Sequence, residues 1–294
     1  MLKVVLLLLT GYFIVTNLRM DASEIAGYLA AAQSLFYVAL SVFVVFLNVQ
    51  AWIWVQLLNN RKRQLPPFRG ILIYMNSQFA KYLPGGFWNL VGRVYLTSKH
   101  GVLLGTQMTA LLYENMMLGL VAVMFAVWLL YEFHFIFLPV LLIAGVLLPL
   151  GYWFYEPVRR TMERVIRRFS KRFEGLELSL PREKFFLYLG CYLLSHLLQG
   201  LAFWILLRSF GIYSVDVVTA SAVFAVAWLV GLMSPLPGGI GIREGALVFL
   251  LSFQVPLDIA TQISIMTRIW NLLGELMLFV LLNGIDLIRK RMAA

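Results

Sequence analysis

The chain has 294 residues, of which 61% are hydrophobic and 13% are charged, and its formal net charge is +10. One soluble core of this length cannot bury so much apolar surface, so we exclude a soluble globular protein and expect the lipid bilayer to be the main solvent. The basic residues lie in short loops beside apolar segments and form no nucleic-acid motif, so we expect no nucleic-acid partner. Cys191 is the single cysteine, which excludes a disulfide framework. No residue pattern predicts a metal or a cofactor.

Apolar segments long enough to cross the bilayer recur along the chain. The N-terminal run resembles a signal peptide, but no cleavage site follows it, so we interpret it as a retained first span. We expect an all-α, polytopic integral membrane protein with about six full spans of roughly 20 residues or more. The expected spans are residues 3–18, 25–57, 103–131, 134–155, 185–210 and 261–286.

Two regions, 71–99 and 217–254, do not fit simple spans because each contains the sequence Leu-Pro-Gly-Gly, at 83–86 and 236–239. Proline removes a backbone donor and glycine adopts dihedral angles closed to other residues, so this sequence breaks a helix. Irregular backbone at membrane depth is tolerated only where protein buries it or where it lines a watery cavity. We therefore predict two broken helices beside a polar cavity.

The basic clusters at 61–69, 159–184 and 289–291 are all placed on the cytoplasmic side by the positive-inside rule. Two full spans separate each cluster from the next, so the region 71–99 must return to the cytoplasmic side and 217–254 to the outer side. This parity predicts two oppositely oriented re-entrant hairpins and an inverted repeat. The predicted organisation is one transmembrane domain, 1–294, with a first half 1–155, a cytoplasmic basic linker 156–184 and a second half 185–294.

Ionisable and amide side chains cluster near both breaks and within the apolar segments, where charges are costly and face a cavity or a partner. A helix that restarts after a break presents free N–H groups, and arginine grips phosphate with a planar fork of donors. The predicted substrate site consists of Lys81, Pro84, Gly85, Gly86, Asn89, Arg93, Pro237, Gly238, Gly239, Arg243, Glu244, Arg268, Asn271 and Glu275. Candidates for proton coupling are Glu114, Glu244 and Glu275. For His196 we expect an interhelical hydrogen bond rather than a proton relay.

Three stretches carry a family resemblance: KYLPGGFWNLVGR at 81–93, PLPGGIGIREG at 235–245 and TRIWNLLGE at 267–275. They resemble the lysylphosphatidylglycerol synthase transmembrane family, also called the flippase-like domain, and the likeness extends over nearly the whole chain. In the multiple peptide resistance factors this membrane domain is linked to lipid translocation, while a separate soluble domain transfers the amino acid. The resemblance implies a stand-alone member without that soluble domain, which moves a lipid between leaflets.

The leading hypothesis is a lipid flippase that moves a phospholipid, a glycolipid or a polyprenyl-phosphate-linked lipid, with an anionic headgroup, through a cavity between the two breaks. Arg93, Arg243 and Arg268 would neutralise the phosphate. Two alternatives stay open: a membrane-embedded enzyme or accessory subunit acting on a lipid-linked substrate of envelope synthesis, and an ion-coupled exporter of small amphipathic solutes. We expect a prokaryotic cytoplasmic membrane protein whose basic loops contact anionic lipids. A homo-oligomer or a partner enzyme is also open.

Overall fold

The computed structural model describes residues 34–82, 88–169, 178–234, 239 and 241–292, and these residues form helices and turns without a strand. The first expected span, 3–18, lies outside the described residues. In chain order the helices are α3 (Ser34–Leu58), α4 (Pro67–Gln78), the 3-10 helix η1 (Phe79–Tyr82), α5 (Trp88–Ser98), α6 (Leu104–Glu132), α7 (Leu138–Phe169), α8 (Arg182–Ser209), α9 (Val217–Leu232), α10 (Ile242–Leu251) and α11 (Leu257–Met292).

Four helices, α3, α6, α8 and α11, are long and apolar enough to cross a membrane, and α7 would be a fifth. The axis of α7 bends by 41° beside Pro149, because proline cannot donate to the helical ladder. These helices confirm the prediction of an all-α, multi-pass membrane protein. Because α7 continues to Phe169, the first part of the predicted linker 156–184 is a helix that prolongs the preceding span.

The two regions that contain the Leu-Pro-Gly-Gly sequences form helices too short to span. We call α4, η1 and α5 the first broken segment, and α9 and α10 the second broken segment. The longest of these helices, α9, has 16 residues and is therefore about 24 Å long, against about 30 Å of hydrocarbon. Within each segment the two α-helices pack on each other. The breaks themselves, 83–87 and 235–238, lie outside the described residues, and the side on which each segment opens stays a prediction.

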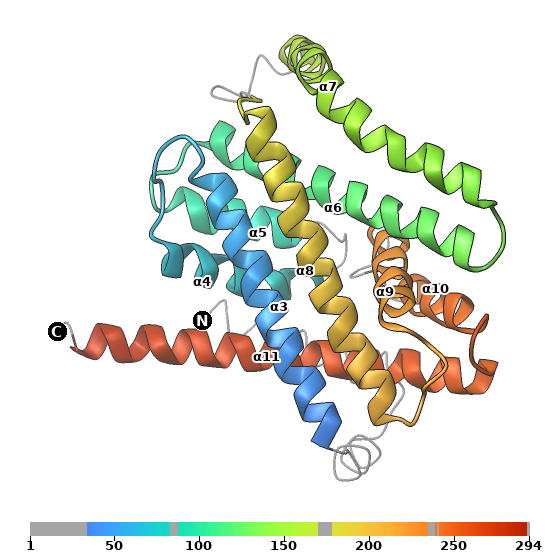
Figure 1. Ribbon diagram of the computed structural model, residues 1–294. Coiled ribbons are helices and arrows are strands. Elements are labelled where there is room, and N and C mark those ends of the chain that lie inside the picture. The colour runs from blue at the N-terminus through green and yellow to red at the C-terminus, as the bar shows by residue number, and fades with distance from the viewer. Residues whose placement is uncertain (1–33, 83–87, 170–177, 235–238, 240, 293–294) are drawn as a thin grey trace.

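The central helices α3 and α8 cross the middle of the molecule side by side, with the first broken segment on one side and the second on the other (Figure 1). Each central helix packs on the broken segment that follows it in the chain. In addition, α11 contacts α3 and α4, while α6 contacts α8 and α9. Thus α6, which follows the first broken segment, packs on the central helix and broken segment of the second half. In the same way α11, which follows the second broken segment, packs on those of the first half. This exchange brings both broken segments to a shared centre.

A close approach of backbones holds the second broken segment against the centre. A Cβ atom on Gly200 of α8 would lie 1.7 Å from Ser221 Oγ and 2.4 Å from Ser221 Cα in α9, so only glycine fits there. Contacts of this kind between small residues are typical of helices packed in membranes, where van der Waals contact replaces the hydrophobic effect between helices. Gly200 and Ser221 therefore allow α8 and α9 to approach each other closely.

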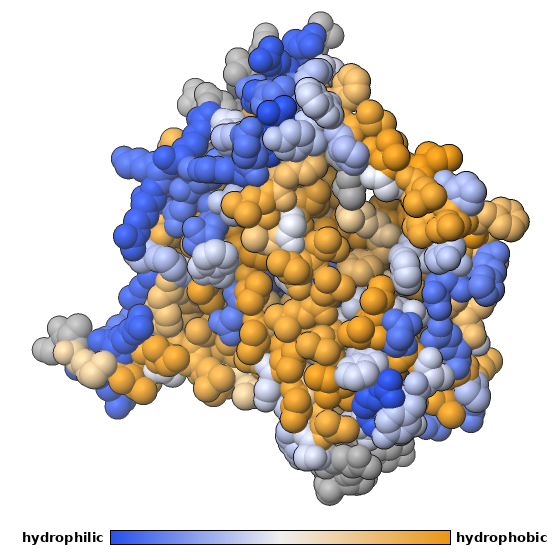
Figure 2. Space-filling view, viewed as in Figure 1, coloured by the Kyte–Doolittle hydropathy of each residue, from blue (hydrophilic) through white to orange (hydrophobic). Residues whose placement is uncertain are grey.

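The outside of the molecule is apolar where lipid would cover it. The surface over α3 and α8 is predominantly hydrophobic, and hydrophilic residues gather toward the helix ends (Figure 2). On α7, the large side chains of Leu142, Ile143 and Leu147 are more than half exposed. Such a surface would aggregate in water but is solvated by acyl chains.

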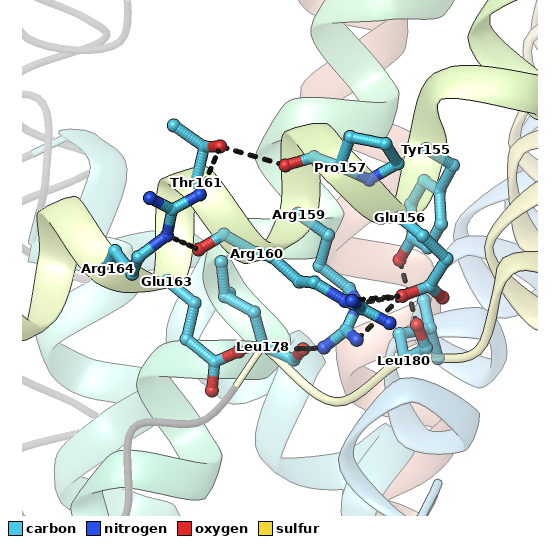
Figure 3. A network of polar contacts seen from close by, with 10 residues as sticks. All are labelled: Tyr155, Glu156, Pro157, Arg159, Arg160, Thr161, Glu163, Arg164, Leu178 and Leu180. Atoms are coloured by element: carbon cyan, nitrogen blue, oxygen red, sulfur yellow. Dashed lines mark hydrogen bonds and ion pairs between the residues drawn. The ribbon is translucent and has the colours of Figure 1, made fainter.

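The chain segment before α8 is fixed to the second half of α7 (Figure 3). Tyr155 donates a hydrogen bond of 2.8 Å to the carbonyl oxygen of Leu180, and Arg159 donates to that of Leu178. Both leucines are 2% exposed, and Glu156 accepts from Arg159 at 2.8 Å. The basic region between the halves is therefore anchored at this point by side-chain contacts to main-chain carbonyl groups.

Candidate functional site

A cavity of about 310 Å³ lies between the two broken segments, and the central helices α3 and α8 contribute to its wall together with α6 and α11. A second pocket of about 40 Å³ shares four residues with it, Lys81, Arg243, Asn271 and Glu275. The predicted site residues Pro84, Gly85, Gly86, Pro237 and Gly238 lie outside the described residues. Every other predicted residue lines one of the two pockets: Lys81, Asn89, Arg93, Glu114, Gly239, Arg243, Glu244, Arg268, Asn271 and Glu275.

The most buried ion pair of the cavity joins the first broken segment to α6. Arg93 donates to Glu114 over 2.5 Å, and both side chains are 3% exposed. The Arg93 guanidinium carbon also lies 3.9 Å from the ring centroid of Tyr74 and 5.1 Å from that of Trp54. A cation on aromatic faces gains further attraction where water is excluded. Glu114 and the two rings therefore hold Arg93 in one place.

The helix α11 carries one ion pair to each broken segment. Glu275 accepts from Lys81 of the first segment, and Arg268 donates to Glu244 of the second over 2.8 Å. The spacing of Arg268 and Glu275 by seven residues places both on one face of α11. The side chains of Lys81, Arg268 and Glu244 are between 15% and 25% exposed, unlike those of Arg93 and Glu114. Glu275 is 5% exposed, so the Lys81 pair is accessible from the cavity through Lys81, and the Arg268 pair through both of its side chains.

Two glycines position Arg243 against α9. Gly239 has a φ of +70°, and a Cβ atom there would lie 2.9 Å from the Gly231 Cα atom. A Cβ atom on Gly231 would in turn lie 2.9 Å from Arg243 Cβ. Because neither glycine carries a side chain, Arg243 packs closely on α9, with its guanidinium carbon 4.9 Å from the ring centroid of Phe224. The positive φ at Gly239 explains why the second Leu-Pro-Gly-Gly sequence ends in glycine.

The charges around the two pockets nearly balance. Four basic residues face three acidic ones among the described residues, which leaves one positive charge in excess. The basic residues are Lys81, Arg93, Arg243 and Arg268, and the acidic residues are Glu114, Glu244 and Glu275. Charges in this setting must be paired because the surrounding protein and lipid solvate ions poorly. The site can therefore accept one additional negative charge.

Part of the cavity wall was not predicted from the sequence, and one predicted hydrogen bond was wrong. Gln50 and Gln199 line the cavity but were not among the predicted site residues, because neither belongs to a recognisable motif. The prediction for His196 is wrong: its Nδ1 atom lies 2.9 Å from the Tyr192 carbonyl oxygen, in the preceding turn of its own helix. The ring bonds within α8 rather than between helices, and His196 also lines the cavity.

A family model described as the lysylphosphatidylglycerol synthase TM region matches residues 1–278. The match includes both broken segments and most of α11, so it covers all of the described cavity wall. It confirms the family resemblance of the three sequence stretches. Neither the curated proteins nor the solved structures gave a match to the chain.

Proposed function

The chain belongs to the lysylphosphatidylglycerol synthase TM region family, a membrane domain of lipid-related flippase-like proteins, and from this premise we propose that it moves an anionic lipid between leaflets. The observation that carries the proposal is the charged cavity between the two broken segments, inside a helical bundle with an apolar exterior. A charged headgroup crosses hydrocarbon only if protein groups replace its water. The cavity supplies such groups.

The size of the cavity fits a headgroup without its tails. A volume of about 310 Å³ lies at the lower end of the range for small-molecule pockets, roughly 300–1,000 Å³. The acyl or prenyl tails would stay in the lipid outside. The proposed substrate is a phospholipid, a glycolipid or a polyprenyl-phosphate-linked lipid whose headgroup alone enters the protein.

Exchange of ion-pair partners gives a mechanism for the passage. A lipid phosphate that enters the cavity competes with Glu275 for Lys81 and with Glu244 for Arg268, since all three are oxyanions. Both pairs join α11 to a broken segment, so each exchange loosens one segment from α11. The two segments then open the cavity in turn, and Arg243 holds the phosphate while the contacts change.

The same exchange provides a place for proton coupling. A carboxylate that loses its cation in a poorly solvated setting favours the protonated form. Glu244 and Glu275 are the two carboxylates that the phosphate would displace, and they are therefore the proposed sites of proton coupling. Glu114 keeps Arg93 as its partner at 2.5 Å in a buried position, and is the less suited of the three.

The test is lipid transfer in liposomes that contain the purified protein and tail-labelled phosphatidylglycerol, with an impermeant quencher outside. We expect transfer without covalent change of the lipid. Arg243→Ala and Arg268→Ala should each slow it roughly tenfold or more, because a hydrogen bond to a charged group contributes about 1.5–3 kcal/mol. Arg160→Ala removes an arginine that is 72% exposed at the end of α7 and should leave the rate unchanged.

The outcomes separate the candidate functions. A covalently modified lipid in the same liposomes would favour the membrane-embedded enzyme. If the labelled lipid moves at the wild-type rate in both cavity variants, the assignment of Arg243 and Arg268 fails. We place the protein in a prokaryotic cytoplasmic membrane, where anionic lipids would contact its basic loops and where a second copy or an envelope-synthesis enzyme would be its partner.

A further inference from the structure

Four amide side chains line the cavity without a hydrogen bond to any described residue. They are Gln50 of α3, Gln78 of α4, Asn89 of α5 and Gln199 of α8, so they approach from four different helices. Gln199 is buried, with 8% of its surface exposed. Buried polar groups are normally satisfied, and each amide offers both a donor and an acceptor. The wall is therefore complementary to an occupant that can also donate and accept.

Further acceptors face the same space. A carbonyl oxygen only accepts, so His196 Nδ1 must donate its proton to the Tyr192 carbonyl oxygen, and in the neutral ring Nε2 is then an acceptor. Asn115 and Asn271 each donate one amide proton to a carbonyl oxygen of their own helix over 2.8 Å. Their amide oxygens remain available as acceptors, since these bonds occupy only the Nδ2 atoms.

Hydroxyl groups match this mixture of donors and acceptors. A phosphate oxygen only accepts, and the basic residues of the cavity satisfy it. An ammonium group only donates, and it would add a positive charge to a site that already has one in excess. The residues 83–87 and 235–238 contain no charged side chain, so they do not alter this balance. A hydroxyl group donates and accepts at one atom, as an unpartnered amide requires.

We propose that the cavity is selective for a headgroup that carries one phosphate and several hydroxyl groups, such as a sugar or a cyclitol, rather than for a cationic aminoacyl headgroup. The basic residues Lys81, Arg243 and Arg268 bind the phosphate, and the four amides with His196 bind the hydroxyl groups. This inference rests on the proposed function for the lipid source of the headgroup. The chemistry itself applies equally to a free sugar phosphate.

The first experiment compares three tail-labelled lipids of equal charge in the liposome assay: phosphatidylinositol, phosphatidylglycerol and phosphatidylethanol. They carry a cyclitol ring, a glycerol and a plain ethyl group. We expect phosphatidylinositol to move fastest and phosphatidylethanol slowest, with a difference of roughly tenfold, since the loss of two neutral hydrogen bonds has about that effect. Equal rates for the three lipids would overturn the inference while leaving the proposed function intact.

Variants of the amides test whether the wall causes the selectivity. Gln199→Leu and Gln50→Leu should each reduce the ratio of the phosphatidylinositol rate to the phosphatidylethanol rate roughly threefold to tenfold, because each removes one or two hydrogen bonds to hydroxyl groups. Gln262→Leu is the matched control, because Gln262 is exposed on α11 and lines neither cavity. An unchanged ratio in both cavity variants would contradict the inference.

A binding measurement keeps the inference testable if no lipid moves at all, which would contradict the proposed function. The deacylated compounds glycerophosphoinositol and glycerophosphoethanol are added to the protein in mild detergent, and the Tm is recorded. Ligands that bind the folded state raise the Tm. We expect a larger rise with glycerophosphoinositol, and a smaller rise in Gln199→Leu. An equal rise for the two compounds, or preferential binding of a lysyl-bearing headgroup, would overturn the hydroxyl assignment.

Discussion

The two broken segments contribute opposite charges to the ion pairs that join them to neighbouring helices. The first segment brings the cations Lys81 and Arg93, which are paired with carboxylates of α11 and α6. The second brings the carboxylate Glu244, which is paired with Arg268 of α11. The helix α11 therefore offers an anion to one segment and a cation to the other. A phosphate in the cavity would replace the carboxylate of α11 in the pair with Lys81, but the carboxylate of the second segment in the pair with Arg268.

The two segments also differ in the burial of their ion pairs. Arg93 and Glu114 are each 3% exposed, whereas Arg268 and Glu244 are 15% and 25% exposed. Removal of one partner from a fully buried pair leaves an uncompensated charge, but a partly exposed pair can be replaced by water or by a ligand. The Arg93 pair therefore anchors the first segment, whereas the Arg268 pair is exchangeable, as is the Lys81 pair through the 23% exposed Lys81 side chain.

The largest expected effect comes from breaking the buried pair. Glu114→Gln leaves Arg93 charged and buried without its partner, and we expect a loss of about 3–5 kcal/mol of stability. Glu244→Gln keeps an acceptor for the Gly241 N–H and breaks only the partly exposed pair, so its cost should be below about 1 kcal/mol. Thermal unfolding in one detergent compares the two variants.

The control for this prediction removes both charges. Arg93→Met with Glu114→Leu replaces the pair by apolar side chains, and should recover most of the stability that Glu114→Gln loses. If Glu114→Gln and Glu244→Gln lower the Tm equally, the distinction between an anchoring pair and an exchangeable pair is wrong.

The next effect concerns how closely each segment approaches its central helix. Gly200→Ala places a methyl group 2.4 Å from the Ser221 Cα atom of α9, while Gly70→Ala places one 2.4 Å from Val55 Cγ2 of α3. Backbone cannot move aside as a side chain can, so Gly200→Ala should cost about 1–3 kcal/mol or more and Gly70→Ala less. The measurement is again the Tm. Gly190→Ala is the control on α8, because no atom lies within 4 Å of its added Cβ.

An equal or larger loss in Gly70→Ala would mean that the first segment, rather than the second, depends on close backbone contact. It would reverse this part of the comparison. A loss in Gly190→Ala would point to helix or folding effects unrelated to packing, since alanine has the higher helix propensity and should be neutral or stabilising there.

The elements of the site were predictable because the bilayer restricts what a sequence can do. A charge within an apolar span must face the interior, so Glu114, Arg268 and Glu275 indicated a cavity before its shape was known. Pro-Gly-Gly in an apolar setting breaks a helix, so the two short-helix segments were also predictable. Both inferences follow from local chemistry and require no knowledge of how the helices pack.

The pairing within the site was not predictable, because it depends on tertiary packing. Lys81 meets Glu275 across 194 positions in the chain, and only the packing of α11 on the first segment brings them together. The amides Gln50 and Gln199 belong to no motif, and a polar side chain within a span is commonly satisfied by its own helix, as Asn48 is by the Val44 carbonyl oxygen. His196 makes such a local bond through Nδ1, where an interhelical bond was predicted.

The smallest expected effect concerns how each segment begins. Asp216 caps α9 by accepting from the N–H groups of Val218 and Thr219 at 2.8 and 3.1 Å, whereas α4 begins with Pro67 and has no side-chain cap. Asp216→Ala should cost about 1 kcal/mol, and Asp216→Asn, which keeps an acceptor, less. Hydrogen exchange of the first turn of α9 measures the local loss. Unchanged hydrogen-exchange protection in Asp216→Ala would mean that α9, like α4, does not depend on a side-chain cap at its N-terminus.

The cap also predicts a pH dependence. Burial raises the pKa of Asp216, but hydrogen bonds from the Thr219 hydroxyl and from the N–H groups of Thr219 and Val218 outweigh it, so the pKa lies below its ordinary value of 3.8. A lowered pKa in the folded state means that the charged cap contributes its full stability above pH 3.8 and loses it as the pH falls through the folded pKa. The Tm difference between wild type and Asp216→Ala should therefore shrink in acid. A difference between wild type and Asp216→Ala that stayed constant down to the lowest pH would show that the carboxylate charge does not fix α9, and the contrast between the segments would then lie in their ion pairs alone.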